Sequence, residues 1–310
     1  MIKKPVIIIS GPTGSGKSSL SIELAKRLNT EIISSDSMQI YRNMNIGTAK
    51  ITEGEMSGIK HHLLDIIDAK DEFSVKDFQQ MALFLIDDIH DREMIPIVVG
   101  GSGLYINSIY YKYDFSDVVP NKDFRDEMEV RYSKNPEELL DKLMSIDSEL
   151  YGSLTVKDKK KIIRALEVYK FSKKKISVNS ELNSDYAFHL YVITDEREKL
   201  YESINLRVDR MIEQGLIEEV KTLMEEGLNE NHQSMKAIGY REIIPYLQGS
   251  INKSEMIEKL KQDSRRYAKR QLTWFRKIKE ARWLDKSNMS KEEMIDKIIG
   301  DIDGFPIFKG

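Results

Sequence analysis

Eight residues near the start of the chain have the types and the spacing of a loop that holds phosphate groups. Residues 11–18 read GPTGSGKS, which fits the pattern G-x-x-x-x-G-K-S. Glycines let such a loop curl until its backbone N–H groups point at phosphate oxygens, and the N-terminus of a following helix adds partial positive charge. Lys17 would reach a terminal phosphate, and Ser18 would hold a Mg²⁺ ion that bridges it. This segment, the phosphate loop, therefore predicts a ligand that carries a di- or triphosphate.

Two further segments follow apolar runs that resemble strands. Asp36 comes two residues after the run 31–34, and it has three interpretations: a cap or turn residue, a Mg²⁺ ligand, or a base that accepts a proton from a nucleophile. Spacing does not choose among the three. Residues 100–103, Gly-Gly-Ser-Gly, follow the run 95–99 and form the glycine turn. This turn is either a tight connection without chemistry or a place where substrate approaches the backbone and the Ser102 hydroxyl donates to a developing anion.

The elements that must position these segments alternate between strand and helix in the first hundred residues. Strands are predicted at 6–9, 31–34, 61–67 and 95–99, and helices at 19–28 and 73–88. Continuous rather than alternating apolar runs indicate a parallel sheet that is covered on both faces, and ligands bind such sheets at the carboxyl ends of the strands. The phosphate loop, Asp36 and the glycine turn each begin at such an end, so we expect them to converge.

The character of the chain changes near Tyr113, where it becomes charged and lacks a β-rich run until a strand-like pattern returns at 188–193. Helices are predicted at 123–132, 136–146, 157–171, 199–214, 217–226 and 256–278. We therefore expect an α/β protein with a P-loop-type parallel sheet core flanked by helices. Residues 1–112 and 188–310 would form this core, and residues 113–187 would form an all-helical insertion domain.

The bulk composition is that of an ordinary soluble protein, with 40% hydrophobic and 32% charged residues among 310. The absence of cysteine excludes disulfides and thiolate metal sites. No apolar stretch is long enough to cross a bilayer, and no secretion signal precedes the first predicted strand, so we expect a cytoplasmic protein. A net charge of −3 does not indicate a polyanionic partner unless basic residues concentrate locally.

Basic residues do concentrate in two places, residues 157–175 and residues 265–277. Each cluster is either a solvated helix face or a contact with a phosphate backbone, and two clusters in a chain of this charge favour the second interpretation. Other residues suggest less chemistry. His61 and His62 are adjacent and would face opposite ways on a strand, and both tryptophans, Trp274 and Trp283, are expected in the core.

Two common classes of phosphate-loop protein fit poorly. A GTPase would carry N-K-x-D, whereas residues 121–124 read NKDF, with the aspartate one position early. A hydrolytic ATPase more often has Asp or Glu where this chain has Gly100 and Gly101.

Seven segments, taken in order, resemble the tRNA dimethylallyltransferase family over nearly the whole chain. They are residues 11–18, 36–42 with 46–50, 61–65, 99–105, 164–168, 237–242 and 268–276. The family transfers a five-carbon prenyl group from dimethylallyl diphosphate to N6 of adenosine 37 in tRNA, and pyrophosphate leaves. The resemblance implies Mg²⁺ as cofactor and two partners, dimethylallyl diphosphate and the tRNA anticodon stem-loop. We expect no membrane partner and a monomeric protein.

The resemblance also implies roles for individual residues. Asp36 would take a proton from the adenine amino group, and Ser102, at a position that is usually Thr in the family, would act near the bridging oxygen with Lys17. The residues implied in diphosphate binding are Gly11, Thr13, Gly14, Ser15, Gly16, Lys17, Ser18 with its Mg²⁺, and Arg207. The residues implied in tRNA contact are Asp36, Ser37, Met38, Gln39, Ser102, Arg125, Lys160, Lys161, Ile162, Ile163 and Arg164.

Two alternatives stay open from the residues. One is prenyl transfer to free adenine nucleotides by the same core, against which the insertion and its basic stretch argue. The other is an RNA-associated P-loop ATPase that binds RNA rather than modifying it.

Overall fold

The computed structural model describes residues 3–113, 115–176 and 181–302. The chain divides into two compact units, a larger one formed by Met1–Tyr110 with Asn183–Gly310 and a smaller one formed by Tyr111–Leu182. Residues 114 and 177–180 of the expected insertion lie outside the described residues. Each unit is described by itself.

The larger unit is built on a six-stranded sheet in the order β3-β2-β4-β1-β5-β6, and every neighbouring pair is parallel. The strands are β1 (Lys4–Ser10), β2 (Ile32–Ser34), β3 (His61–His62), β4 (Ile97–Val99), β5 (Tyr186–Thr194) and β6 (Arg282–Asp285). The side chains of Val6, Ile7, Ile8 and Ile9 are all fully buried, because both faces of the sheet are covered. The predicted parallel α/β core is therefore confirmed.

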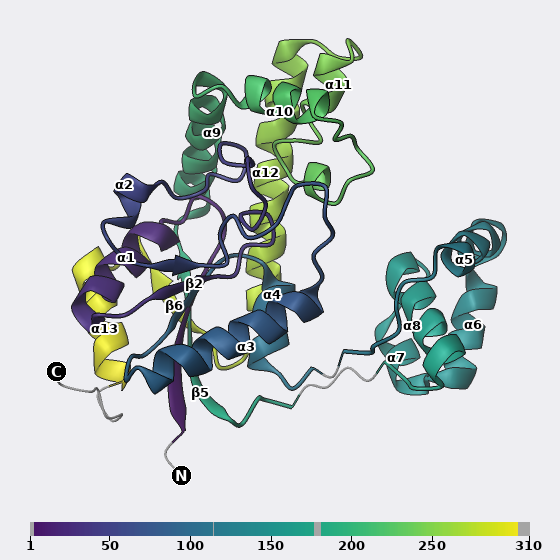
Figure 1. Cartoon of the computed structure of the whole chain (residues 1–310), viewed down its shortest axis with the longest axis horizontal. Helices are drawn as coiled ribbons and strands as arrows, with labels where there is room; N and C mark the ends of the chain where they lie inside the picture. Colours follow the sequence, from purple (N-terminus) through teal and green to yellow (C-terminus); the bar gives the residue numbers. More distant parts are fainter. Residues whose placement is uncertain (1–2, 114, 177–180, 303–310) are drawn as a thin grey trace. The chain divides into compact units, whose positions relative to one another are not determined.

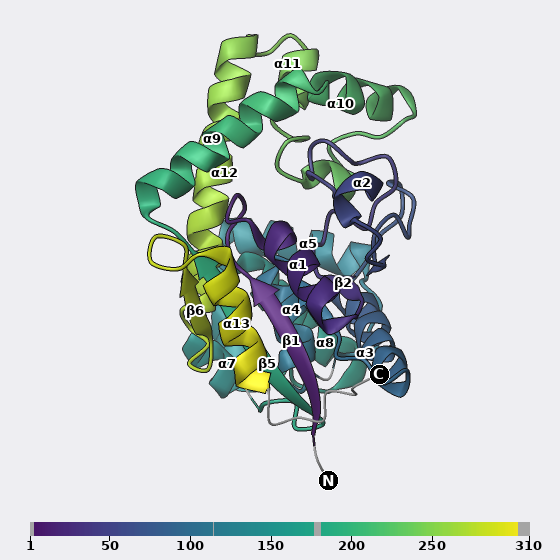
Figure 2. The same ribbon diagram turned by 90° about the vertical axis from the view of Figure 1, so that its left-hand side faces the viewer.

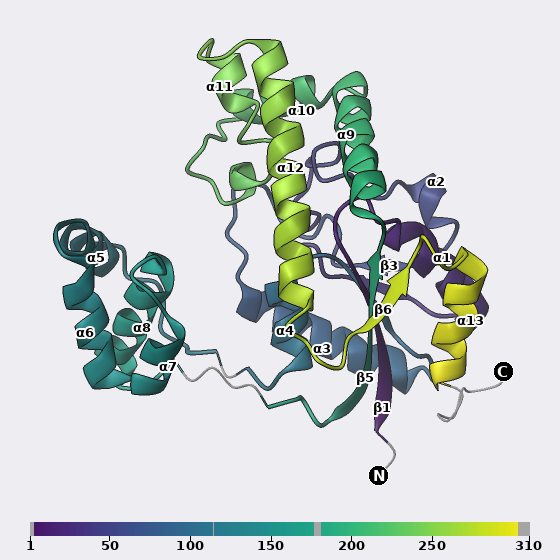
Figure 3. The ribbon, with the colours of Figure 1, turned by 180° about the vertical axis from the view of Figure 1, so that it is seen from behind.

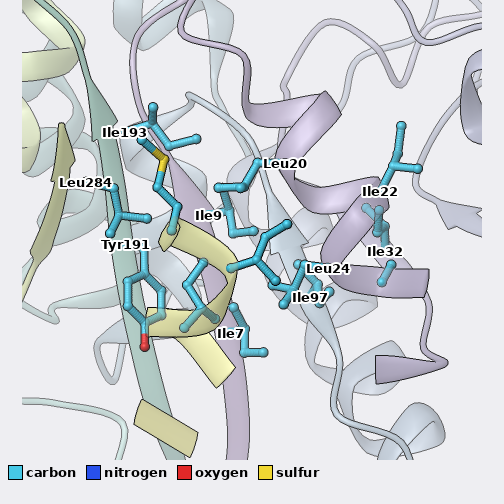
Figure 4. Close-up of a cluster of buried hydrophobic side chains, with 14 of the residues drawn as sticks. Ile7, Ile9, Leu20, Ile22, Leu24, Ile32, Ile97, Tyr191, Ile193 and Leu284 are labelled. Carbon is cyan, nitrogen blue, oxygen red and sulfur yellow. The ribbon is translucent and has the colours of Figure 1, made fainter. Parts of the chain in front are cut away.

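Helices lie on both faces of this sheet and beyond the carboxyl ends of its strands (Figures 1 and 3). They are α1 (Lys17–Leu28), α2 (Glu53–Met56), α3 (Val75–Asp91), α4 (Gly103–Tyr110), α9 (Arg197–Glu213), α10 (Leu216–Glu225), α11 (Ile244–Leu247), α12 (Lys253–Phe275) and α13 (Lys291–Ile302), with a 3₁₀ turn at Ser234–Lys236. Figures 1 and 3 show α1 and α13 together on one side of the sheet, and Figure 2 views the sheet from that side. Side chains from both helices pack with Ile7, Ile9 and Tyr191 of the sheet in one buried cluster (Figure 4). On the other face, the ring of Tyr110 in α4 lies 5.5 Å from that of Phe188 in β5.

The third predicted strand is much shorter than expected. The sequence predicts a strand over 61–67, but β3 comprises only His61 and His62. Leu63 and Asp65 adopt φ angles of +61° and +53°, a left-handed backbone that ends an extended chain. The following residues instead hydrogen-bond to the loop after β2, as in the bond from the Ile66 N–H to the Ile40 carbonyl at 2.8 Å.

The expectation that both tryptophans lie in the core is also wrong: Trp283 is only partly buried, and Trp274 is 36% exposed. Its indole covers the backbone of Gly103 at the surface, where a Cβ atom would lie 2.5 Å from the indole Cδ1. Helix α12 carries this residue, and it runs beside α9 in Figures 1 and 3.

The smaller unit consists of α-helices packed on a common core (Figure 1). The helices are α5 (Lys122–Lys134), α6 (Pro136–Ile146), α7 (Ser148–Ser153) and α8 (Lys159–Ser172). Asn121 and Asn135 accept hydrogen bonds from N–H groups in the first turns of α5 and α6, which explains where both helices begin. The sequence patterns missed α7, because a six-residue helix is too short to show periodicity.

Across the residues described, no helix has both the length and the apolar character needed to cross a membrane.

Candidate active site

Three loops meet at the carboxyl ends of three adjacent strands. Strand β4 lies between β1 and β2, so the glycine turn after β4 is flanked by the phosphate loop after β1 and by the Asp36 segment after β2. Backbone hydrogen bonds fix their spacing: the Ser35 N–H donates to the Val99 carbonyl at 2.7 Å, and the Gly100 N–H donates to the Ile9 carbonyl at 3.2 Å. The expected convergence of these loops is therefore a property of the fold.

The phosphate loop has the curled backbone that its glycines predict. Gly11, Gly14 and Gly16 adopt φ angles of +146°, +78° and +89°, a region that side chains disfavour. A Cβ atom on Gly11 would lie 2.6 Å from the Ile193 carbonyl oxygen, so no larger residue fits there. The Ser15 side chain is 1% exposed, and its hydroxyl has no hydrogen-bond partner among the described residues. A buried, unpaired hydroxyl inside such a loop is a donor suited to a phosphate oxygen.

Two cations and one carboxylate share this site. The Lys17 ammonium donates to the carbonyls of Gly11 and Pro12 at 2.9 and 2.8 Å. Burial and the neighbouring Arg207 guanidinium lower the pKa of Lys17 to about 7, and the Asp36 carboxylate opposes this shift. Burial likewise lowers the pKa of Arg207, again opposed by Asp36. A bound multivalent anion would compensate both cations.

Ligand affinity should therefore depend on pH. Because the pKa of Lys17 is about 7 and a bound diphosphate would raise it, the ammonium form gains on binding. A diphosphate ligand should bind more weakly as the pH rises above 7, with net proton uptake at pH 8. Calorimetry in two buffers of different ionisation enthalpy measures this uptake, and the Lys17→Met variant should abolish it. Equal binding enthalpies in both buffers would contradict the assignment.

Asp36 and Ser102 occupy neighbouring loops that are joined by Ser37. The Asp36 carboxylate accepts a hydrogen bond from the Met38 N–H at 2.9 Å. The Ser102 hydroxyl accepts one from the Ser37 N–H at 3.1 Å and donates to the Ser37 hydroxyl at 3.2 Å. Asp36 is only partly buried, so its second oxygen can face a substrate. The two residues are thus positioned as a pair, one a carboxylate and one a hydroxyl.

A further set of contacts holds the loop formed by residues 45–50 against this site. The Glu219 carboxylate accepts hydrogen bonds from the N–H groups of three consecutive residues, Asn45, Ile46 and Gly47, at 2.8 to 3.1 Å. The same loop presents the Thr48 carbonyl to the Gln39 amide at 3.2 Å and to the Arg207 guanidinium at 3.4 Å. Glu219 therefore helps to place the loop that orients the Arg207 guanidinium.

A small pocket of about 30 Å³ lies at the carboxyl ends of β2 and β4. Ser18, Gln39 and His61 line it, so it connects the phosphate loop with the segment after Asp36. Ser18 is exposed in the first turn of α1. No group of three or more histidine, aspartate or glutamate side chains that could hold a metal ion occurs in the described part of the chain. The exposed Ser18 hydroxyl fits a Mg²⁺ ion that would take its other ligands from substrate phosphates and water.

The residues expected to contact tRNA in the smaller unit differ in their surroundings. Lys160 and Lys161 are exposed at the start of α8. Arg125 and Arg164 instead make ion pairs with Glu167, at 2.8 and 2.6 Å, although their side chains are still 40% and 30% exposed.

Ile162 and Ile163 require a correction. Their side chains are 0% and 5% exposed and belong to the core of the helical unit. They lie on the side of α8 that packs into the core, whereas Lys160 and Lys161 lie on its exposed side. Their side chains cannot contact RNA while the unit is folded, so any tRNA contact on this helix would have to come from its exposed residues.

Three polar residues have a structural importance that the sequence patterns did not assign: Gln271, Glu219 and Glu167. Gln271 lies on the stripe of α12 that also buries Ala268 and Phe275. A polar side chain among buried apolar ones needs a hydrogen-bond partner. The apolar spacing around Gln271 is therefore the local feature of the sequence that could have drawn attention to it. The partners themselves lie far away in the sequence.

Several known proteins are similar to this chain over most of its length. Residues 39–278 match the model of a family described as IPP transferase. A curated protein named tRNA dimethylallyltransferase from Acetivibrio thermocellus is 47% identical over 297 residues, covering 94% of this chain and 95% of that protein. One of the same name from Alkaliphilus oremlandii is 47% identical over 308 residues, covering 98% of each.

Solved structures give the same result. The full-length tRNA isopentenylpyrophosphate transferase from Bacillus halodurans is 43% identical with a TM-score of 0.74, covering 97% of this chain and 96% of that one. A eukaryotic dimethylallyltransferase acting on tRNA is 30% identical with a TM-score of 0.83, covering 99% and 81%. With the family model matching most of its length, this chain belongs to the IPP transferase family of transferases.

Proposed function

We propose that this protein transfers a dimethylallyl group from dimethylallyl diphosphate to N6 of adenosine 37 in tRNA, with release of pyrophosphate. The observation that supports this most directly is the meeting of an anion-binding loop with Asp36 and Ser102 at adjacent strand ends. The names of the relatives point to the same reaction.

The leaving group would be bound by the phosphate loop and Arg207. The backbone N–H groups of Gly14 and Gly16, the Ser15 hydroxyl and the Lys17 ammonium would surround its oxygens. The bond between the prenyl C1 atom and the bridging oxygen breaks, and its electron pair stays on the diphosphate. Because an allylic carbon ionises readily, stabilising this charge and excluding water are the main catalytic tasks.

The acceptor side of the reaction would depend on Asp36. The N6 amine of adenosine attacks C1 as the bond to oxygen breaks, a new N–C bond forms, and the amine loses one proton to the Asp36 carboxylate. Ser102 would donate to the bridging oxygen or orient the amine from the neighbouring loop. The target base must leave the anticodon-loop stack to reach a buried carbon, so we infer that it is flipped.

Mg²⁺ would be held by Ser18 together with the diphosphate oxygens and water. When bound, it supplies additional neutralisation of the charge that develops on the leaving group. The exposed position of Ser18 in the first turn of α1 and beside the pocket fits this role.

The helical unit would bind the tRNA anticodon stem-loop. Lys160 and Lys161 carry exposed charge there, and Arg125 and Arg164 retain partly exposed guanidinium groups in the same unit. Phosphate contacts of this kind contribute affinity that falls with salt and carries no sequence information. On the larger unit, Ser37, Met38 and Gln39 would contact the nucleotides next to the target. We propose that a monomer suffices.

Reversing the charge of Lys160 and Lys161 should weaken tRNA binding and flatten its salt dependence. The slope of log K against log salt is negative, and each lost phosphate contact reduces its magnitude by roughly 0.7 to 0.9. Binding titrations at several salt concentrations measure this slope for the Lys160→Glu/Lys161→Glu variant. Lys26→Glu/Lys221→Glu, at exposed positions on α1 and α10, is the matched control. An unchanged slope would show that the α8 lysines only solvate a helix face.

One incubation tests the proposed function. Protein, Mg²⁺ and labelled dimethylallyl diphosphate are mixed with bulk tRNA or with AMP, and the tRNA is digested to nucleosides. We expect label in N6-dimethylallyladenosine from tRNA and almost none in AMP. Label in AMP alone would indicate an adenine-nucleotide transferase, and RNA-stimulated ATP hydrolysis without prenyl transfer would indicate an ATPase.

A further inference from the structure

We propose that Gln271 is a positioning residue, which fixes the distance between the phosphate loop and the glycine turn that carries Ser102. The proposal rests on the proposed function for the reaction it serves. Helix α12 would thus help to shape the site that binds dimethylallyl diphosphate. This role is separate from any contact of its basic residues with RNA.

The Gln271 side chain connects two loops that hold opposite sides of the reacting bond. It is 6% exposed. Its carbonyl oxygen accepts a hydrogen bond from the Thr13 N–H at 3.0 Å, and its amide nitrogen donates to the Gly101 carbonyl at 2.9 Å. A primary amide offers an acceptor and a donor at once, which neither an apolar residue nor a carboxylate does. The Thr13 N–H is thereby engaged with the protein, and its expected role in diphosphate binding passes to the rest of the loop.

The glycine turn is shaped to receive α12. A Cβ atom on Gly101 would lie 2.1 Å from the Gln271 amide nitrogen, and one on Gly103 would lie 2.5 Å from the Trp274 indole Cδ1. Gln271 and Trp274 are three residues apart and lie on adjacent positions of one helix face. Two of the glycines in the turn are therefore explained by the approach of this helix.

Ser102 lies between these two contacts. Its hydroxyl is bonded to Ser37, the residue next to Asp36, so the position of the turn also sets the position of the reacting pair. Tyr267, one helical turn before Gln271, interacts with the side chains of both Ser102 and Gln271. Helix α12 thus holds the glycine turn at a fixed place relative to the phosphate loop. A shift of about 1 Å in such a preorganised site can lower the rate about 100-fold.

Two variants of similar size separate positioning from folding. Gln271→Leu removes both hydrogen bonds. Gln271→Glu keeps an acceptor for the Thr13 N–H but places a carboxylate oxygen against the Gly101 carbonyl until it is protonated. We expect kcat to fall about 10- to 100-fold in both at pH 8. The dissociation constants for dimethylallyl diphosphate and tRNA should stay within about twofold, because their binding groups remain.

The pH profile gives a readout that a purely structural role would not move. Protonation of the carboxylate introduced by Gln271→Glu restores a donor to the Gly101 carbonyl, so the kcat of this variant relative to the unmodified protein should rise as the pH falls. The same ratio for Gln271→Leu should stay flat. Gln262→Leu, at an exposed site on the same helix, should match the unmodified protein throughout.

Hydrogen exchange tests the contact without the reaction. The Thr13 amide should exchange faster in Gln271→Leu than in Gln262→Leu. This expectation does not depend on the reaction, so it can be met even if the protein transfers no prenyl group to tRNA and the proposed function fails. Unchanged exchange at Thr13, or a kcat within twofold of the unmodified protein in both variants, would overturn the positioning role.

Discussion

Replacing Asp36 with alanine should lower the rate of prenyl transfer by about 10²- to 10⁴-fold while tRNA still binds. The range is what a positioned general base contributes. Asp36 follows β2 beside the glycine turn, and it is the carboxylate that offsets the charge of Lys17 and Arg207. A single-turnover assay with labelled dimethylallyl diphosphate and saturating tRNA measures the chemical step, and a filter-binding titration measures tRNA affinity.

A second substitution separates the base from the loop it supports. Asp36→Asn keeps an oxygen that accepts from the Met38 N–H but cannot take a proton at neutral pH. It should be nearly as inactive as the alanine variant. Asp91→Ala, an exposed residue at the end of α3 near the start of β1, should behave as the unmodified protein. Normal turnover by Asp36→Asn would show that the residue shapes the loop rather than accepting the proton.

The parts of the site that are contiguous in the sequence could be predicted. The phosphate loop contains its own glycines, lysine and serine, and the apolar runs on either side identify β1 and α1. The position of Asp36 and of the glycine turn at strand ends followed from the parallel sheet, because all its strands end on the same edge. These inferences need only local composition and one rule of topology.

The parts that depend on distant contacts could not be predicted. The bond from Thr13 to Gln271 spans 258 residues, and Glu219 reaches back 172 to 174 residues to the loop at 45–47. No periodicity specifies such pairs. The shortened β3 has a similar cause, since the residues after His62 turn to pair with the loop after β2 and leave the sheet. Trp274 was misplaced because its helix covers a glycine at the surface, which hydrophobicity alone does not reveal.

Removing the Glu167 carboxylate should destabilise the helical unit by roughly 3 kcal/mol, at the lower end for breaking a buried ion pair. Glu167 is 0% exposed and accepts from the guanidinium groups of Arg125 and Arg164 and from the Asn121 N–H at 2.7 Å. Burial alone would raise its pKa, but these donors outweigh burial and lower it. The stabilisation is therefore present above the ordinary carboxyl pKa and is lost as the pH falls below it.

The expected functional result of Glu167→Ala is a selective loss of tRNA affinity. In the proposed function, Arg125, Lys160 and Arg164 would reach RNA only from a folded unit, whereas dimethylallyl diphosphate would bind the larger unit. Both tryptophans, Trp274 and Trp283, belong to the larger unit, so their fluorescence reports on it alone, and hydrogen exchange of α5 and α8 reports on the helices.

Glu129→Ala is the matched control, because Glu129 pairs with Lys159 at the surface of the same unit and such pairs contribute at most about 1 kcal/mol. Glu167→Ala should leave the tryptophan signal and the affinity for dimethylallyl diphosphate unchanged, while α5 and α8 exchange faster and tRNA affinity falls. If α5 and α8 stay protected and tRNA affinity still falls, the two arginines act on RNA directly and Glu167 only orients them. If neither changes, the buried carboxylate has no part in RNA binding, and the exposed lysines of α8 must account for it.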